Sequence, residues 1–432
     1  MKIFGEEKVP VHIPIDLSVL DPVVKIECDY VLKGGFIVDG SGSEPYLGDV
    51  AIQDDKIVAV GEFETVEGAQ VIDATGLYVA PGFIDLHTHT EDYWRQGGSG
   101  AMVLRQGITT QIAGNCGTSV QDMSSYLDNL TDLPINVGMF TGYKTLRREF
   151  LADGKAMNET ALSQMKEKLA ITIENGSFGL SVGLGYYPQT KATMEELVDL
   201  AGVVKEHDAL FALHIRDEGN NVIPAVKEAI AIAEKSGVRL QYNHIKTWKK
   251  QNWDKQDTVL QLFNEAIARD IDIMGDVYGY PFSSNDIGGN QVTISEDNIK
   301  KIMQNPNVMI ASDSGLNSSG RAVHPRAYAH ASRILAHYVR DEQVLTVQEA
   351  VHKMTEMPAV RLGLHRRGLL KEGYQADISV FRLEAVKDNA QRNAPNLLAE
   401  GMSYVFVNGK PAIFEGGITG ERGGIALRFG QE

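Results

Sequence analysis

Apolar, strand-like runs alternate with amphipathic, helix-like stretches along the middle of the chain, residues 80–364. The runs have the length and the β-branched or aromatic content of buried strands, and they read GFIDLH, TTQIAG, INVGMF, FGLSVGL, ALFALH, RLQYNH, IDIMGDVY and NVMIAS. Segments such as TMEELVDLAGVVKEH and TVLQLFNEAIARD lie between them and repeat apolar residues at helical spacing. This alternation predicts an α/β fold, a (β/α)8 barrel of the TIM type, with its active site at the carboxyl ends of the strands.

A doubly wound open sheet is the competing fold for such an alternation. That fold places a glycine-rich, phosphate-binding turn after its first strand. Here the first strand-like run leads into His87 and His89 instead. The histidines favour the barrel.

The two ends of the chain have a different texture, with short β-rich pieces broken by Gly, Asp or Asn. Such pieces occur in residues 26–79 and again in residues 365–432. We expect them to form one small β-sandwich domain, built on an antiparallel layer, into which the barrel of residues 80–364 is inserted. Residues 1–25 contain prolines and show little pattern, which predicts an N-terminal surface arm.

Composition narrows the classes of partner. The net charge of −16 argues against a nucleic-acid or anionic-membrane surface, so a small-molecule substrate is expected. The presence of only two cysteines argues against a disulfide framework, and no apolar run reaches the ~20 residues of a membrane span. The start MKIFGEEKVPV lacks the apolar core of a signal peptide. These features predict a cytoplasmic protein, and they leave open whether it forms a homo-oligomer.

Residues able to bind metals recur where five of the predicted strands end, which is where barrel enzymes place their chemistry. Each has an ordinary structural explanation when taken alone: a buried thiol, a core or loop histidine, or a helix N-cap. Those explanations do not account for five strand ends that all carry a metal-binding type. The residues are His87 and His89 after the first strand, Cys116 after the second, His214 after the fifth, His244 after the sixth and Asp313 after the eighth.

These residue types predict a zinc site. Zinc binds imidazole nitrogen and thiolate sulfur, and catalytic sites keep one position open for water. Cys116, His214 and His244 supply three ligands of this kind. Asp313 would accept a proton from the activated water and return it to a leaving nitrogen. His87 and His89, with Asp313, would frame a second and weaker metal position.

Several longer motifs resemble one family. They are APGFIDLHTHTE, GITTQIAGNCG, FGLSVGLGYYP, HIRDEG, NHIK, the DVYGY run, ASDSG followed by HPRAY, and GLLKEGYQADISVF. Together they resemble the amidohydrolase superfamily and, within it, the N-acyl-D-amino-acid deacylases or D-aminoacylases. The resemblance covers the chain from about residue 29 and implies a barrel flanked by a small β-sandwich.

The resemblance also implies roles for individual residues. Cys116, His214 and His244 would hold the tight zinc, His87 and His89 would line the weak site, and Asp313 would be the general acid and base. A clamp for the substrate's α-carboxylate would consist of Lys246, Tyr280 and Arg326, with Ser284 assisting. A surface ion pair is the alternative for Lys246 and Arg326, and packing or turn formation is the alternative for Tyr280 and Ser284.

Two departures from the family concern the substrate entrance. The connection between Tyr280 and Asp313 is short where relatives carry an insertion, which predicts a more open pocket. Tyr143 and Lys144 stand where relatives commonly have histidine after a glycine. Lys144 and Arg147 are expected to be solvated charges rather than anion contacts.

The sequence thus predicts a zinc-dependent hydrolase that cleaves the amide of N-acyl-D-amino acids. A different amide or cyclic-amide hydrolase, or a dipeptidase, on the same metal site is the alternative within enzymes. Relatives active on cyclic amides often use a bridging lysine, and Cys116 holds that place here. A non-catalytic zinc protein is the alternative from another class, but a structural site would be closed by four protein ligands.

Overall fold

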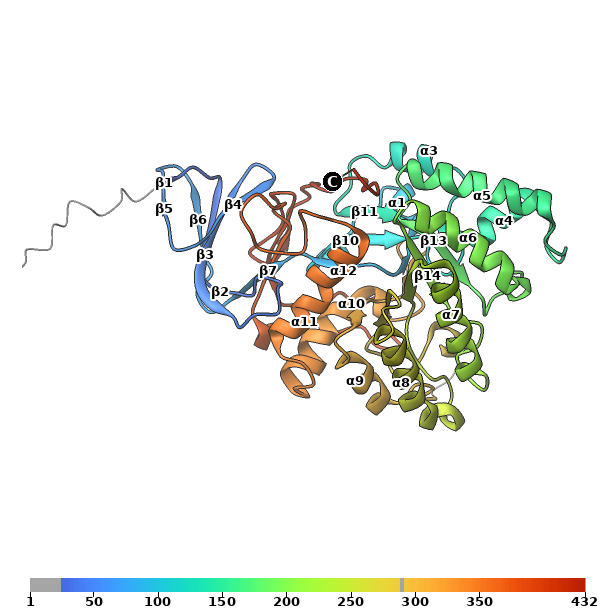
Figure 1. Cartoon of the computed structure of the whole chain (residues 1–432). Helices are drawn as coiled ribbons and strands as arrows, with labels where there is room; N and C mark the ends of the chain where they lie inside the picture. Colours follow the sequence, from blue (N-terminus) through green and yellow to red (C-terminus); the bar gives the residue numbers. More distant parts are fainter. Residues whose placement is uncertain (1–24, 288–290, 432) are drawn as a thin grey trace, which may run out of the picture.

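A computed structural model describes residues 25–287 and 291–431 of the chain (Figure 1). Of the predicted N-terminal arm, residues 1–25, only Lys25 lies within the described residues. Across these two described ranges, no helix has both the length and the apolar character needed to cross a membrane.

A barrel of parallel strands forms the larger part of the molecule, and every predicted strand run overlaps one of its strands. The prediction of a (β/α)8 barrel is therefore confirmed. Neighbouring strands pair in parallel register. They are β8 (Phe83–Asp85), β10 (Ile108–Ala113), β11 (Asn136–Met139), β13 (Gly179–Gly183), β14 (Leu210–His214), β15 (Arg239–Tyr242), β16 (Ile273–Val277) and β17 (Val308–Ile310).

Short continuations of the strands close the barrel. β11 is followed by β12 (Thr141–Gly142), which pairs with β13. β17 is followed by β18 (Ser314–Gly315), which pairs with β9 (Thr88–His89), the continuation of β8. The first and last strands therefore meet just beyond their carboxyl ends, and this brings His89 next to Asp313.

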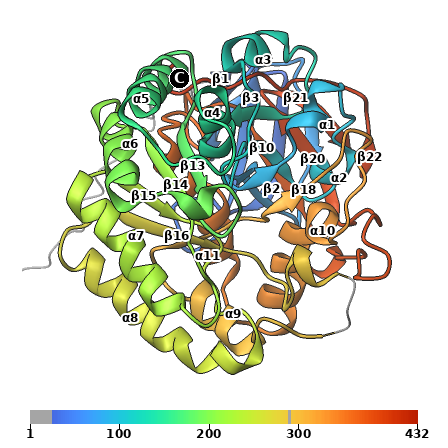
Figure 2. The same ribbon diagram turned by 90° about the vertical axis from the view of Figure 1, so that its right-hand side faces the viewer.

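Helices surround the strands, as the view in Figure 2 shows for α5 to α9. The predicted amphipathic segments form α6 (Met194–Glu206), α7 (Val222–Ser236) and α8 (Gln256–Ile267). In α6, the Thr193 side chain caps the first turn by accepting a hydrogen bond from the Glu196 amide. Leu197 and Leu200 are fully buried against the barrel, and each such side chain contributes about 2 kcal/mol of hydrophobic stabilisation.

The remaining helices have these bounds: α1 (Glu91–Arg95), α2 (Ala101–Leu104), α3 (Met123–Asn129), α4 (Tyr143–Phe150), α5 (Glu159–Glu174), α9 (Glu296–Met303), α10 (Arg326–Arg333), α11 (Val347–Met354) and α12 (Glu356–Leu362). The 3₁₀ segments are η2 (Gln189–Lys191), η3 (Lys250–Lys255), η4 (Ser284–Asp286) and η6 (Leu383–Ala385), and η5 (Ile334–Asp341) is a π-helical segment.

A nine-stranded sheet joins the two ends of the chain, as predicted. Its strands are β2 (Tyr30–Ile37), β3 (Tyr46–Gln53), β4 (Lys56–Gly61), β6 (Gln70–Asp73), β7 (Tyr78–Pro81), β19 (Ile378–Phe381), β20 (Met402–Val407), β21 (Lys410–Phe414) and β22 (Gly417–Ile418). A separate parallel pair consists of β1 (Lys25–Ile26) and β5 (Glu64–Thr65). The ends meet where β7 pairs antiparallel with β19.

The expected purely antiparallel layer is wrong in one respect, because β2 pairs in parallel with both β6 and β7. β4 ends at the edge of the sheet where β2 also ends, and residues 62–69 carry the chain back to the opposite edge, so β6 runs in the same direction as β2. The last residues also reach the barrel, where the Val137 amide donates to the Ile425 carbonyl at 2.9 Å. The domain boundaries 26–79, 80–364 and 365–432 stay predictions.

Candidate functional site

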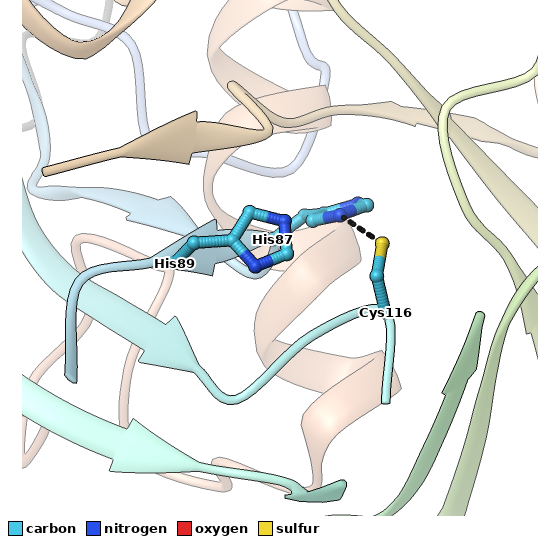
Figure 3. Close-up of side chains that lie close together, drawn as sticks. All are labelled: His87, His89 and Cys116. Carbon is cyan, nitrogen blue, oxygen red and sulfur yellow. Dashed lines mark hydrogen bonds between the residues drawn. The ribbon is translucent and has the colours of Figure 1, made fainter. Parts of the chain in front are cut away.

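The carboxyl ends of the barrel strands carry a compact cluster of metal-binding side chains. In three overlapping triads, the ligand atoms all lie within 4.8 Å of one another. One triad is Cys116 with His214 and His244, the second is His87 with His89 and Cys116, and the third is His87 with His244 and Asp313. Figure 3 shows the second triad. The structure thus brings together all six residues that the sequence singled out at strand ends.

The spacing within the cluster fits a zinc ion. Sγ of Cys116 lies 3.6 Å from Nε2 of His87 and 3.8 Å from Nε2 of His244. Two ligands at ordinary zinc bond lengths on a tetrahedral ion lie about 3.3–3.8 Å apart. Nδ1 of His214 lies 2.8 Å from Nε2 of His244, closer than two ligands of one tetrahedral zinc, so these two rings would have to separate by about half an ångström to bind the ion together. The donor types and the distances from the thiol match what zinc requires.

The electrostatics of Cys116 also fit a metal ligand. Burial raises the pKa of its thiol, but hydrogen bonds from His214, His244 and His87 outweigh burial and hold that pKa well below the ordinary value of 9.0. This lowering favours the thiolate, the form that binds metal. A divalent cation would replace the protons that the surrounding imidazoles otherwise hold.

Two carboxylates, the buried Asp276 and the partly buried Glu218, orient the histidines. The sequence analysis assigned a role to neither. Asp276 lies 3.2 Å from Nδ1 of His87, and Glu218 lies 2.9 Å from Nδ1 of His244. A carboxylate on one ring nitrogen leaves the other free for a metal, an arrangement typical of metal-ligating histidine. Both acids lie in motifs named in the sequence analysis, Asp276 in the DVYGY run and Glu218 in HIRDEG. Their positions near the ends of predicted strands could have identified them as residues of the site.

The backbone is strained at three of the site residues. Cys116, His244 and Asp313 have φ angles of 52°, 38° and 50°, in the left-handed region that side-chain-bearing residues seldom adopt. Each such conformation costs on the order of 1–3 kcal/mol and clusters at functional sites. In this backbone conformation, each of the three side chains points toward the metal cluster, close to the end of its strand.

The turn that carries Cys116 is held by close contacts. Gly117, with a φ of 84°, approaches Gln189 so closely that a Cβ atom would lie 1.9 Å from Oε1 of Gln189. That glutamine donates to the Cys116 carbonyl at 3.0 Å, and the Gly117 amide donates to Oγ of Ser181 at 3.0 Å. Only glycine fits at position 117. The tight turn that it allows fixes the position of the Cys116 side chain at the carboxyl end of β10.

Asp313 connects the cluster to a cation. Its Oδ1 lies 3.1 Å from Nε2 of His89 and its Oδ2 lies 2.9 Å from Nη2 of Arg326. Burial raises the pKa of Asp313, but the charges of Arg326 and His87 outweigh it and hold the pKa well below the usual value. The carboxyl group is therefore held in its ionised form, the form that a general base requires.

Two cations lie beside the cluster and flank one tyrosine ring. Nζ of Lys246 lies 5.4 Å and Cζ of Arg326 lies 4.7 Å from the ring centroid of Tyr278. Arg326 also donates to Oγ of Ser284 at 2.9 Å. Lys246 pairs with Glu218 at 2.5 Å. Lys246 and Arg326 are both buried, so the alternative of a surface ion pair is wrong for both.

The structure places Tyr280 differently from its predicted neighbours. Its ring packs against His324 and His330, and the guanidinium of Arg333 lies 5.0 Å from its centroid. Tyr278 instead lies between the two cations. Burial raises the pKa of Tyr278 to about 12, so its hydroxyl stays protonated. The two tyrosines are two residues apart just beyond β16, and the sequence did not reveal which one faces the site.

The expectation for Arg147 is also wrong. Arg147 is buried and donates to the carbonyl oxygens of Ala152 and Lys155, so it is neither a solvated charge nor an anion contact. Tyr143 is buried as well and donates to the Glu196 carboxylate. These residues stabilise the loop after the third strand.

Comparisons with known proteins agree with this geometry. The amidohydrolase family model matches residues 78–412. An N-acyl-D-glutamate deacylase of Alcaligenes xylosoxydans xylosoxydans is 31% identical over 476 residues, which cover 93% of this chain and 96% of that one.

Solved structures show the same similarity. An N-acyl-D-glutamate deacylase from Bordetella bronchiseptica, complexed with zinc and a phosphonate mimic of the tetrahedral intermediate, has a TM-score of 0.86 and 28% identity, and the match covers 93% of this chain and 100% of that chain. A D-aminoacylase structure concerned with its binuclear metal centre has a TM-score of 0.86 and 26% identity, with the same coverage. The chain therefore belongs to the amidohydrolase family, and within it to the group of the N-acyl-D-amino-acid deacylases.

Proposed function

We propose that this protein is a zinc-dependent hydrolase that cleaves the amide of N-acyl-D-amino acids into a carboxylate and a free D-amino acid. In this proposal Cys116, His214 and His244 hold the tightly bound zinc, and His87 and His89 line a second, weaker position. The named activities of the relatives support the reaction and the zinc. The thiolate and imidazole donors, at the distances given above, support these ligands.

A group of buried hydrogen-bond donors, here called the anion cradle, supports a substrate with a carboxylate. It consists of Lys246, Tyr278 and Arg326. Nε and Nη1 of Arg326 and the hydroxyl of Tyr278 are buried side-chain donors without a hydrogen-bond partner. Unpaired donors of this kind are costly unless a ligand satisfies them. They lie beside Lys246, and two cations with a hydroxyl are suited to a carboxylate. The amino acid's α-carboxylate would satisfy all of them, with Ser284 holding Arg326 in place.

The mechanism uses Asp313 as the group that moves the proton. Cys116, His214 and His244 would hold a zinc ion, which would supply the Lewis acidity for activating a water molecule and polarising the acyl carbonyl. Asp313 accepts the proton of the attacking water through Oδ1 and delivers it to the amide nitrogen as the C–N bond breaks. Lys246, Tyr278 and Arg326 hold the carboxylate, so that the scissile amide stays next to Asp313.

The alternatives predict different substrates. A cyclic-amide hydrolase or a dipeptidase would use the same cluster, but the cradle fits a free carboxylate beside the scissile bond, as in an N-acyl amino acid. In a non-catalytic zinc protein, the unpaired donors beside Asp313 would cost free energy and would have no ligand to satisfy them. These features favour the deacylase.

A substrate panel tests the proposal. The zinc-loaded protein is incubated with N-acetyl-D-amino acids, dihydrouracil, a hydantoin and unblocked dipeptides, and a chelator-treated sample is the control. Metal-dependent release of amino acid from the acetylated substrates, well above turnover of the others, is expected. Faster turnover of a cyclic amide or a dipeptide would replace the proposed substrate class.

We also infer that the partners are small molecules. A cytoplasmic location and the absence of a nucleic-acid partner stay predictions of the sequence.

A further inference from the structure

A cavity opens beside the metal cluster. Its volume is about 210 Å³ and its lining includes His214 and Glu218, which border the cluster and the anion cradle. Ser283 and Asn285 line its other side, next to Ser284, which holds Arg326. A substrate fixed by its carboxylate and its scissile amide would therefore direct a substituent into this cavity.

The walls of the cavity are aromatic and polar. Tyr186 and Trp248 line it, and the Tyr186 ring lies 4.7 Å from the His214 ring between centroids. Trp248 donates its indole N–H to Oδ2 of Asp286 at 3.2 Å, which ties the two loops together. These two aromatic rings stand among polar lining residues, a mixture that suits an uncharged side chain with apolar and polar parts.

The arginine of the cavity is already neutralised. Arg216 donates to both carboxylate oxygens of Glu228, at 2.8 Å from Nε and 2.8 Å from Nη2. Its Nη1 donates to the Thr190 carbonyl and its Nη2 also donates to the Ala192 carbonyl. Binding a second carboxylate would require Arg216 to give up these contacts, so it does not serve as a clamp for an acidic side chain.

A carboxylate without a cationic partner also lines the cavity. Asp217 accepts hydrogen bonds from the Gly219 amide at 2.6 Å and from the Asn221 side chain at 3.2 Å. Within residues 25–287 and 291–431, no cation forms an ion pair with Asp217. An anionic side chain would therefore be repelled rather than bound.

From this charge pattern we propose that the cavity receives the uncharged side chain of the D-amino acid, that it rejects aspartate and glutamate side chains, and that Asp217 is the residue that determines this selectivity. The inference rests on the proposed function and adds the class of side chain to it. The selectivity proposed here is the opposite of the one named for the N-acyl-D-aspartate and N-acyl-D-glutamate deacylases among the relatives.

N-acetyl-D-glutamine and N-acetyl-D-glutamate provide the test, because they have nearly the same shape and differ in charge. The zinc-loaded protein should hydrolyse the glutamine derivative with a kcat/KM at least about tenfold higher, since like charges oppose each other in the cavity. Equal or faster hydrolysis of the glutamate derivative would overturn the inference and leave the proposed function intact. No hydrolysis of either compound, or of N-acetyl-D-leucine, would instead count against the proposed function.

The variant Asp217→Asn tests the assigned residue. Asparagine keeps an oxygen for the Gly219 amide and removes the charge, so the ratio between the glutamine and glutamate substrates should shrink by roughly tenfold. Asp199→Asn is the matched control, because Asp199 is an exposed aspartate on α6, outside the cavity lining. An unchanged ratio in Asp217→Asn, or the same change in Asp199→Asn, would contradict the role of Asp217.

Discussion

Arg326 and Asp313 form a buried ion pair, with Nη2 of Arg326 lying 2.9 Å from Oδ2 of Asp313. The same nitrogen donates to Oγ of Ser284 at 2.9 Å. This geometry leaves Nε and Nη1 of Arg326 for another anion, and it turns Oδ1 of Asp313 toward the histidines. Asp313, the proposed base, and Arg326, part of the proposed carboxylate clamp, are therefore held in position by each other.

Arg326→Met should damage both binding and turnover. KM should rise roughly 10- to 100-fold, the effect of losing a hydrogen bond to a charged group, and kcat should fall because Asp313 loses the partner that orients it. Steady-state kinetics on an N-acetyl-D-amino acid measure both constants, with Arg326→Lys as the charge-conserving comparison. A rise in KM with kcat unchanged would show that Arg326 does not act through Asp313.

Tyr278→Phe and Tyr280→Phe should differ although the residues are two apart. Removing the Tyr278 hydroxyl takes a donor from the cradle, so KM should rise by roughly tenfold. Tyr280→Phe should change KM by less than about twofold, because the Tyr280 ring packs against His324 and His330 and does not lie between the two cations of the cradle. The same kinetic assay decides the matter. The reverse order of effects would return the substrate role to Tyr280.

Cys116→Ala should remove the tightly bound zinc, since the thiolate lies between the imidazoles of two triads. Cys28→Ala is the matched control, because Cys28 is the other buried free cysteine and lies in the small sheet region. Metal content after gel filtration, measured by atomic emission, distinguishes them. Full zinc occupancy in Cys116→Ala would remove Cys116 from the ligand set.

Much of the architecture could be predicted because its signals are local. Each barrel strand is a short apolar run and each outer helix has its own amphipathic period, so the order of elements follows from the sequence. The metal-binding residues could be found for the same reason, since the carboxyl ends of parallel strands converge at one edge. His87 and Asp313 are far apart in the chain, yet barrel closure brings them within 3.4 Å.

What could not be predicted depends on the direction in which side chains point. Tyr278 and Tyr280 lie in an irregular segment after β16, where the strand's alternation no longer applies. Asp276 and Glu218 have no fixed spacing from the histidines that they orient. Arg147 has the composition of a surface charge, but carbonyl groups of its own loop satisfy it. Such contacts arise only after the backbone is folded.

Lys353 should make the protein more stable as the solution becomes alkaline. Its ammonium group is buried and donates to the carbonyl oxygens of Asn305 and Val308 at 2.7 and 2.8 Å, and burial lowers its pKa to about 8. Between that value and the ordinary 10.5, the unfolded chain binds more protons at this residue than the folded protein. The free energy of unfolding should therefore rise with pH in this window, by about 3 kcal/mol from Lys353 alone.

Lys353→Met isolates that contribution from other groups that titrate at alkaline pH. Urea unfolding of both proteins between pH 7 and pH 11 gives the comparison, and the difference in stability between them should change in favour of the lysine protein as pH rises. A difference that is constant with pH would mean that the folded pKa of Lys353 is not lowered.

The most direct measurement of the central claim uses racemic N-acetylmethionine with the zinc-loaded protein, followed by chiral chromatography. Hydrolysis should stop at half conversion, with free D-methionine released and N-acetyl-L-methionine left, and chelator-treated protein and zinc-bound Asp313→Asn should both be inactive. Release of L-methionine, complete hydrolysis of the racemate, or undiminished hydrolysis by the Asp313→Asn variant would contradict a zinc-dependent, D-selective deacylase that works through Asp313.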